Sequence, residues 1–301
     1  MKERKIVRDI KGLKIQGAHN VAKSALVALK EHMHSSHADT KIQLIAELGK
    51  LRTVLEQSRP TEPMLRNVLK YVYEHSAGQG LRDLRESFFH SIQRTLIDIE
   101  EAEKTVHRMG MQKIRNGMVV FTHCHSSTVM GILQAAKMDK IKFEVHNTET
   151  RPHLQGRLTA EELARMGIKV THYVDSAARL ALKKADIMLI GCDCFTSEGK
   201  VINKIGSELF AEVASKRDIP IYVCTTTWKF DPKTVFGFEE VIEERLRQEI
   251  WPRAPKNVCI DNHAFEQVDP NLVTGMITEF GIYKPQVLVE ELRQRSPWMF
   301  N

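Results

Sequence analysis

Residues 119 to 127, VVFTHCHSS, place a nucleophilic side chain between a predicted strand and a predicted helix. Cys124 lies at this junction, and Ser126 and Ser127 are candidate N-caps for the helical segment TVMGILQAAK that follows. The free N–H groups and the macrodipole of a helix N-terminus favour negative charge, so the position predicts a thiol that is biased toward the thiolate. The alternative is a buried structural cysteine, which is the more common role of this residue type.

A second candidate reacting group is Asp193, which follows an apolar run in the segment LIGCDCF. Burial beside apolar groups and near a thiolate would keep this carboxyl protonated, so that it could act as an acid at neutral pH. The alternative is a helix or turn cap. Two cysteines flank Asp193 and two histidines flank Cys124, but C-x-C without a second pair at ligand spacing is a weak zinc signal. We therefore predict no metal site.

Basic residues near these groups could bind an anion. The segment EGKVINKIGSELFA (198–211) is interpreted as the start of a helix, with Asn203 and Lys204 in its first turn. A lysine together with free backbone N–H groups forms an anion site there. Lys229 and Arg151 could add charge-assisted hydrogen bonds to phosphate. The alternative for each basic residue alone is a solvated surface position.

Two patterns of hydrophobicity predict the elements that position these residues. From Gly17 to about Val106 apolar residues recur at helical spacing, which predicts a helical bundle, and Pro63 suits the first turn of the helix MLRNVLKYVYEHS. After RMGMQKIRNG, helical segments alternate with short β-rich runs, namely MVVF, KFEV, KVTHYV, DIMLIG, IPIYVC and NVCI. This alternation predicts an α/β fold with a Rossmann-like, doubly wound parallel sheet. We expect a helical domain at 1–112 and an α/β domain with the active site at 113–301.

Polar clusters follow five of the predicted strands. They are His123 to His125, NTETRP, Asp175 with Ser176, GCDC and TTTWKF. In open parallel sheets, ligands bind outside the carboxyl ends of the strands. We therefore expect the five clusters to meet at one edge of the sheet.

Composition limits the class of protein. With 42% hydrophobic and 27% charged residues among 301, the chain is typical of a globular protein. No apolar run is long enough for a membrane span, the N-terminus lacks a signal-peptide core, and the cysteines are odd in number, so we predict a cytoplasmic protein without a membrane partner. The formal charge of +6 comes from basic residues interleaved with acidic ones, which makes nucleic acid an unlikely partner and fits an anionic small substrate.

Several motifs together resemble one family, which includes archaeal ribose-1,5-bisphosphate isomerases, methylthioribose-1-phosphate isomerases and regulatory subunits of translation initiation factor 2B. The shared motifs, in the order of the family, are RPTEPMLRN (59–67), THCHSS (122–127), TETRPHLQG (148–156), VDSAAR (174–179), GCDC (191–194), NKIG (203–206) and WKF (228–230). The wording of TETRP, DSAAR and NKIG is similar to the ribose-1,5-bisphosphate isomerase branch.

The resemblance implies a catalytic pair, Cys124 and Asp193, which regulatory members generally lack. It implies isomerisation of ribose 1,5-bisphosphate to ribulose 1,5-bisphosphate, as in nucleoside salvage, without a cofactor, in a homo-oligomer that is a dimer or a hexamer. The implied substrate-binding residues are Gln16, Gly17, Ala18, Arg59, Ser126, Arg151, Gln155, Asn203, Lys204 and Lys229.

The chain departs from this family pattern at Gln16, because the isomerases carry an arginine of an RGA stretch there. A different 1-phosphorylated pentose, such as methylthioribose 1-phosphate, therefore stays an alternative substrate. A regulatory subunit that binds a sugar phosphate is the alternative to an enzyme.

Overall fold

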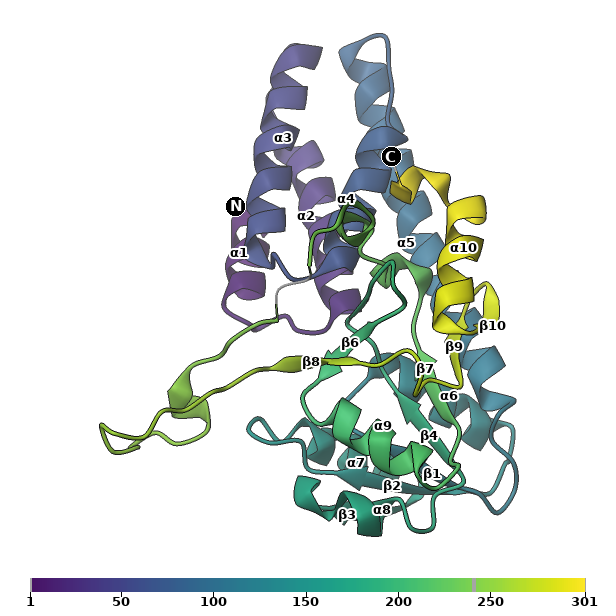
Figure 1. Cartoon of the computed structure of the whole chain (residues 1–301). Coiled ribbons are helices and arrows are strands. Elements are labelled where there is room, and N and C mark those ends of the chain that lie inside the picture. Colours follow the sequence, from purple (N-terminus) through teal and green to yellow (C-terminus); the bar gives the residue numbers. More distant parts are fainter. Residues whose placement is uncertain (1, 240–241, 301) are drawn as a thin grey trace.

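A computed structural model of the chain describes residues 2–239 and 242–300. Five helices come first in the sequence and stand side by side above the sheet in Figure 1. Their bounds are α1 (Lys2–Lys11), α2 (Ala18–Ser35), α3 (Lys41–Ser58), α4 (Pro63–Glu74) and α5 (Leu81–Met111). The predicted helical region is confirmed.

Local sequence signals explain where two of these helices begin. Thr40 and Gln43 form a capping box at the start of α3, because each side chain bonds a backbone N–H group of the other residue. Pro63 occupies the first position of α4, as predicted, where its missing N–H group costs nothing. The predicted apolar stripe of α3 is buried along its length, at Leu44, Leu48, Leu51 and Leu55.

The rest of the chain builds a seven-stranded sheet in the order β10-β9-β7-β4-β1-β2-β3, in which only the β9–β10 pair is antiparallel. The strands are β1 (Val119–Thr122), β2 (Glu144–Thr148), β3 (Lys169–Tyr173), β4 (Ile187–Ile190), β7 (Ile221–Cys224), β9 (Gly275–Thr278) and β10 (Gly281–Tyr283). The helices of this part are α6 (Ser127–Met138), α7 (Gln155–Arg165), α8 (Ala178–Ala181), α9 (Ser207–Ser215) and α10 (Pro285–Arg295).

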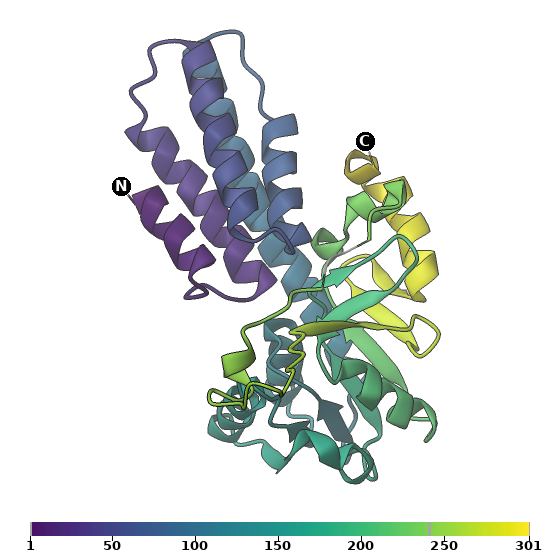
Figure 2. The same cartoon turned by 60° about the vertical axis from the view of Figure 1, so that its left-hand side comes forward.

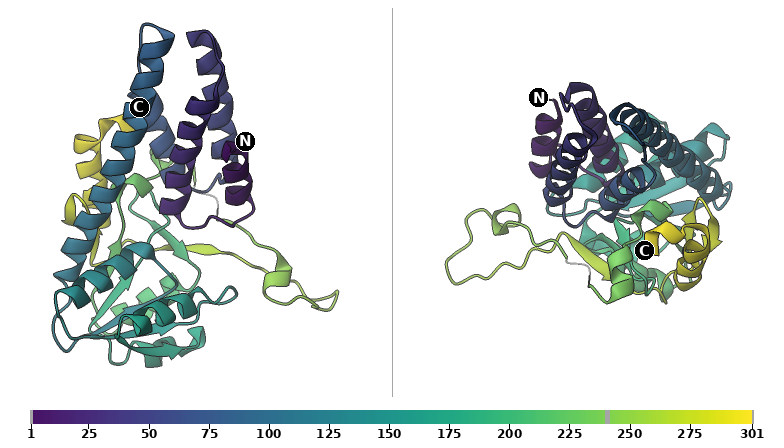
Figure 3. Two further views of the ribbon diagram at one scale, coloured as in Figure 1. Left: turned by 180° about the vertical axis from the view of Figure 1, so that it is seen from behind. Right: turned by 90° about the horizontal axis from the view of Figure 1, so that it is seen from above.

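Helices cover both faces of this sheet, which confirms the doubly wound prediction (Figure 3). Along β4, Ile187 and Leu189 pack into a cluster with residues of α6 and α7, whereas Met188 and Ile190 pack into a cluster with residues of α8 and α9. Side chains of a strand point alternately to the two faces, so an unbroken apolar run is what a strand covered on both faces requires.

The strand order reverses at β1, which pairs in parallel with β2 on one side and with β4 on the other. From β1 the chain adds β2 and β3 on one side of this strand, and it then crosses back to add β4 on the other side. The carboxyl ends of β1 and β4 therefore border the crevice in which doubly wound proteins bind ligands. Cys124 follows β1 and Asp193 follows β4.

Two expectations about secondary structure are wrong. Asn203 and Lys204 do not start a helix, because they end the strand β6 (Val201–Lys204) and α9 begins only at Ser207. The strand β6 pairs with β5 (Cys194–Phe195) and β8 (Phe265–Val268) in a small antiparallel sheet. The run NVCI is not a strand: it belongs to an arm, residues 242–264, that extends away from the body in Figures 1 and 3. Without a neighbouring strand, a short apolar run has no ladder to join.

The predicted division at residue 112 stays a prediction. One hydrophobic cluster contains Leu26 and Leu65 of the helical part, residues 2–111, together with Phe121 and Phe195 of the α/β part, residues 119–300. Within the described ranges, no helix is long and apolar enough to cross a membrane. The cytoplasmic location also stays a prediction.

Candidate active site at the switch point

The loop after β1 is held by hydroxyl groups from the neighbouring connections. The backbone N–H of Cys124 donates to Thr150 Oγ1 at 3.0 Å, and its carbonyl accepts from the Thr159 hydroxyl at 2.8 Å. Cys124 itself has φ of +66°, a left-handed conformation that few residues other than glycine adopt. Ser126 caps α6 as predicted, because its hydroxyl accepts from the N–H of Val129. The thiol is thereby fixed at the carboxyl end of β1.

The two histidines beside Cys124 are held by hydrogen bonds within the protein. The ring of His123 lies between Thr148 Oγ1, 2.6 Å from Nδ1, and the carbonyl of Ile205, 2.8 Å from Nε2. Burial lowers the pKa of His123 to about 4, so the ring is neutral and Nε2 donates to the carbonyl. His125 Nδ1 bonds Thr159 Oγ1 at 3.0 Å. Between residues 2 and 239 and between 242 and 300, no group of three or more His, Cys, Asp or Glu side chains is arranged to hold a metal ion.

The thiolate expected at Cys124 is wrong for the ligand-free protein. Burial raises the pKa of the Cys124 thiol to about 11, while the Lys204 ammonium and the N–H of His125 lower it and the Asp193 charge raises it further. The helix begins only at Ser127, so the thiol is not in its first turn, and desolvation outweighs the favourable charges. The charges of Lys204 and Asp193 therefore act on the thiol in opposite directions.

Gly191 lets the loops after β1 and β4 meet. A Cβ atom at Gly191 would lie 2.6 Å from Ser126 Oγ, so no larger residue fits without moving the cap of α6. Two residues later, the N–H of Asp193 donates to the carbonyl of Ile202 at 2.9 Å, which ties the aspartate to β6. The flanking Cys192 and Cys194 are both buried, whereas Asp193 stays partly exposed.

The loops after β2 and β3 join the same edge. The carboxylate of Asp175 accepts from the N–H groups of Thr150 and Arg151, at 2.8 and 2.7 Å. The side chain of Arg151 is exposed, and its guanidinium donates to the carbonyl of Ile250 in the arm at 3.3 Å. Gln155 is the first residue of α7.

The loop after β7 is held by the helical part. Asn67 of α4 donates to the carbonyls of Trp228 and Phe230, at 2.8 and 2.7 Å. Between these two residues, Lys229 is buried and its ammonium donates to the carbonyl of Cys192 at 2.6 Å, which links this loop to the one that carries Asp193. The predicted convergence of the five loops is therefore confirmed.

Sequence reasoning missed Glu62, although it lies in the quoted RPTEPMLRN motif. Its side chain is buried, its Oε1 accepts from the Arg59 guanidinium at 2.8 Å, and its Oε2 has no hydrogen-bond partner among the described residues. Burial, and then the charge of Asp193, raise the pKa of Glu62 to about 7, against the opposing effects of Arg59 and Lys229. The only signal in the sequence was an acidic residue directly before the Pro63 helix start.

The other predicted binding residues come from β6 and from the connection between α1 and α2. Asn203 is buried and donates to Ser207 Oγ at 2.9 Å, and the Lys204 ammonium lies 4.4 Å from the ring centre of Phe265. Gln16, Gly17 and Ala18 belong to the connection between α1 and α2, at the end of the bundle nearer the α/β part (Figure 2). The Gln16 side chain is exposed and donates to the carbonyl of Leu13 at 2.7 Å, within its own turn.

Comparison with known proteins identifies the family, because residues 14–285 match the Initiation factor 2 subunit family. The chain belongs to this family. Two relatives are the ribose 1,5-bisphosphate isomerase of Thermococcus kodakarensis, 35% identical over 97% of this chain and 94% of the relative, and the methylthioribose-1-phosphate isomerase of Fervidobacterium nodosum, 32% identical over 94% and 86%. A solved structure from Pyrococcus horikoshii OT3, titled translation initiation factor eIF-2B, is 29% identical, with a TM-score of 0.82 over 96% of this chain and 98% of that chain.

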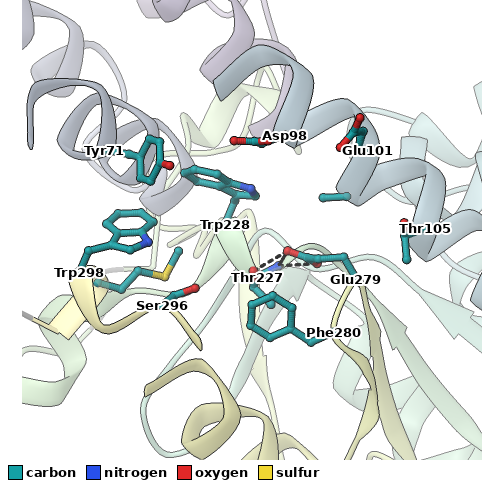
Figure 4. Close-up of a pocket in the computed structure, with 12 residues that line it drawn as sticks. Tyr71, Asp98, Glu101, Thr105, Thr227, Trp228, Glu279, Phe280, Ser296 and Trp298 are labelled. Carbon is teal, nitrogen blue, oxygen red and sulfur yellow. Dashed lines mark hydrogen bonds between the residues drawn. The ribbon is translucent and has the colours of Figure 1, made fainter. Parts of the chain in front are cut away.

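This member of the Initiation factor 2 subunit family also has a cavity of about 310 Å³ between α5 and the loop after β7 (Figure 4). Its walls are the rings of Tyr71, Trp228 and Trp298, which pack against one another, and the acidic side chains of α5 and of the β9–β10 turn. Neither Cys124 nor Asp193 lines it. Because Trp228 is next to Lys229, this aromatic packing helps to fix the loop after β7.

Proposed function

We propose that this chain is an aldose-ketose isomerase that converts ribose 1,5-bisphosphate to ribulose 1,5-bisphosphate, with Cys124 and Asp193 as its catalytic pair. The observation that carries the proposal is the position of Cys124 and Asp193 in the loops after β1 and β4, the two strands that border the crevice at the switch point. The relative from Thermococcus kodakarensis, matched over nearly its whole length, supports this substrate.

The chemistry follows from the phosphate on C1. An aldose whose C1 oxygen is phosphorylated cannot open to a free aldehyde, so the ring oxygen must receive a proton as its bond to C1 breaks. The Asp193 carboxyl donates that proton, and the Cys124 thiolate removes the proton from C2, so that the C2–H electron pair forms the C1=C2 bond of an enol phosphate. The Cys124 thiol then returns its proton to C1 while the Asp193 carboxylate takes the proton of the C2 hydroxyl, which gives the ketose and restores the protonated Asp193.

The reaction requires that the Cys124 thiol and the Asp193 carboxyl together hold one proton, and that this proton is on Asp193. Since the pKa of the Cys124 thiol is about 11, most ligand-free molecules at neutral pH carry the thiol form. The Lys204 ammonium and the N–H of His125 both favour the thiolate, because each places positive charge beside the sulfur. We propose that the reactive arrangement is a minor form that the substrate selects.

The phosphates would be held by groups that surround the pair. Lys204, Lys229, Asn203 and Ser126 are in or beside the loops that meet there, and Lys229 would exchange its bond to the carbonyl of Cys192 for a phosphate oxygen. Arg151 and Gln155 follow β2 at the same edge of the sheet, and Arg59 lies 3.8 Å from Glu243 of the arm. In this proposal Gln16, Gly17 and Ala18 approach the sugar only when their connection closes over it.

Methylthioribose 1-phosphate is the second candidate substrate, and Gln16 is the observation that favours it. A glutamine at this position removes one cation from the site, and a substrate with a single phosphate needs fewer cations. The relative from Fervidobacterium nodosum bears the name of this activity.

The deciding experiment is incubation of the purified protein with each sugar phosphate and detection of the ketose by NMR. We expect ribose 1,5-bisphosphate to give ribulose 1,5-bisphosphate, with ribose 5-phosphate unchanged and Cys124→Ser inactive. Turnover of methylthioribose 1-phosphate alone would favour the second candidate. If no sugar phosphate is converted but one raises the melting temperature, a regulatory subunit that binds a sugar phosphate is the better assignment.

We further propose that the protein is a homo-oligomer, a dimer or a hexamer, in which the arm contacts another copy. Leu246 and Trp251 of the arm are exposed at 71% and 48%, although large apolar side chains on a projecting segment are normally covered. Light scattering should give a multiple of the 34.5 kDa protomer mass. Replacing both residues by Ser should lower that mass.

A further inference from the structure

The cavity between α5 and the loop after β7 has acidic walls. Figure 4 shows the carboxyl groups of Asp98 and Glu101, both on α5, on one side of the cavity and that of Glu279, from the β9–β10 turn, on the other. Among the described residues that line it there is no lysine, arginine or histidine. Asp98 is paired with Arg94 at 2.9 Å, and this arginine does not line the cavity. The walls therefore carry an excess of negative charge.

Glu279 shows what this excess costs. Its two carboxyl oxygens accept from the N–H of Thr227 at 3.1 and 3.0 Å, and one of them also accepts from the Thr227 hydroxyl. Burial raises the pKa of Glu279, although these hydrogen bonds favour its ionised form. A cation in the cavity would offset this cost, because it would supply the positive charge that the walls lack.

The other walls are aromatic. The ring centroids of Tyr71, Trp228 and Trp298 lie 5.1 to 5.5 Å apart, and the plane of Tyr71 meets those of the two indoles at 81° and 65°. The three rings therefore form a corner and not a flat stack, and Phe280 adds a fourth ring to the lining. The face of an aromatic ring attracts a cation electrostatically, so these walls suit an organic cation.

The indole N–H of Trp228 is a donor without a partner at the same place. The side chain is only 8% exposed, and no residue that the structure describes accepts from this N–H group. Figure 4 shows the indole nitrogen on the side of the ring that faces Glu101 and Thr105 across the cavity. A buried N–H group without an acceptor is costly, so a ligand that fills the cavity should offer it an oxygen.

We propose that this cavity binds a quaternary ammonium ion that carries a hydroxyl group, of which choline is a simple example. The ammonium group lies against the rings and offsets the charges of Glu101 and Glu279, and the hydroxyl oxygen accepts from Trp228. A primary ammonium has three donors to satisfy, whereas two of the three carboxyl groups already bond donors of the protein; a quaternary ammonium has none. The site does not depend on the proposed isomerase activity.

The first test is calorimetric titration of the purified full chain with choline and two analogues. Ethyltrimethylammonium lacks the hydroxyl group, and dimethylbutanol is choline with carbon in place of the charged nitrogen. We expect choline to saturate one site and dimethylbutanol to bind at least about tenfold more weakly, because it lacks the charge. Equal binding of choline and dimethylbutanol would overturn the proposal. So would the lack of both heat and a change in tryptophan fluorescence up to about 10 mM choline.

The second test uses variants of the walls. Glu101→Gln should weaken choline binding by about threefold or more and leave dimethylbutanol unaffected. Glu100→Gln is the matched control, because it removes the same charge from the next residue, which pairs with Lys23 and does not line the cavity. Equal losses from the two variants would show that the charge acts at long range, which overturns a site in this cavity.

Trp228→Phe tests the hydroxyl contact, because it keeps an aromatic ring and removes the N–H group. In the wild type, choline should bind more tightly than ethyltrimethylammonium. In Trp228→Phe the two ions should bind equally, while both still bind more tightly than dimethylbutanol. A preference for choline that survives this substitution would overturn the assigned contact between the hydroxyl group and Trp228.

Discussion

The loop that carries Cys124 is held by neighbours in the same sheet, whereas the loop that carries Lys229 is held by a helix from the other part of the chain. Thr150 and Thr159 bond the first loop, and both follow β2. Asn67 of α4 bonds the second, whose Lys229 donates to the carbonyl of Cys192 next to Asp193. The thiol side of the site therefore depends on the α/β part alone, and the carboxyl side depends on its contact with the helical part.

The largest expected effect comes from removing either member of the pair. Cys124→Ser and Asp193→Asn should each lower turnover by about a hundredfold to ten-thousandfold, the range for a positioned acid or base. Steady-state kinetics with equal folded concentrations, checked by circular dichroism, measure this loss. Cys259→Ser, which changes an exposed cysteine of the arm, should leave turnover unchanged. If a folded Cys124→Ser or Asp193→Asn protein kept wild-type turnover, that residue would have no part in the reaction.

The second effect is a pH dependence of stability on the thiol side. The pKa of His123 is about 4 in the folded protein and about 6.5 in the unfolded chain, so the unfolded chain binds more protons between these values. The free energy of unfolding should therefore fall as the pH drops from about 6.5 to about 4, by up to about 3 kcal/mol from this residue. Urea titrations of wild type and His123→Gln across this window measure it. Equal slopes for the two proteins would exclude His123 as the cause.

The third effect should be confined to the carboxyl side. Asn67→Ala leaves two buried carbonyls without their donor, which should cost about 2 kcal/mol of stability and loosen the Lys229 loop. The fractional loss of activity should be larger than the fractional change in the rate at which iodoacetamide alkylates Cys124. Thr53→Ala, on the exposed side of α3, is the control. If Cys124 alkylation changes as much as activity, the two sides are not held independently.

The smallest expected effect concerns the connection between α1 and α2. Gln16→Arg should tighten binding of ribose 1,5-bisphosphate by about 1.5 kcal/mol, roughly tenfold, because a charge-assisted hydrogen bond replaces a weaker one. Calorimetric titration measures the change. Asn20→Arg adds the same charge one turn further along and should have a smaller effect. Equal gains from both variants would mean that the charge acts through space and that Gln16 has no contact with the ligand.

The sequence predicted the fold better than the state of the site. Apolar runs such as IMLI of β4 identify strands that are covered on both faces, since burial leaves a pattern along the chain. The protonation of Cys124 leaves no such pattern, because it depends on desolvation by distant segments and on Lys204, which the sequence placed on a helix and the structure places on a strand. Glu62 was missed for the same reason, because the charges that act on it, such as those of Asp193 and Lys229, come from other parts of the chain.

The helix α5 constrains how this molecule can move. It runs for 31 residues, about 46 Å, without a proline, and its only glycine is Gly110 in its last turn. Phe88 and Ile92 pack with the other helices of the bundle, whereas Val106 packs against the sheet. A hinge motion between the two parts would have to bend this helix, so closure of the helical part over the sheet would deform α5. A short connection such as the one that carries Gln16 can move without such a deformation.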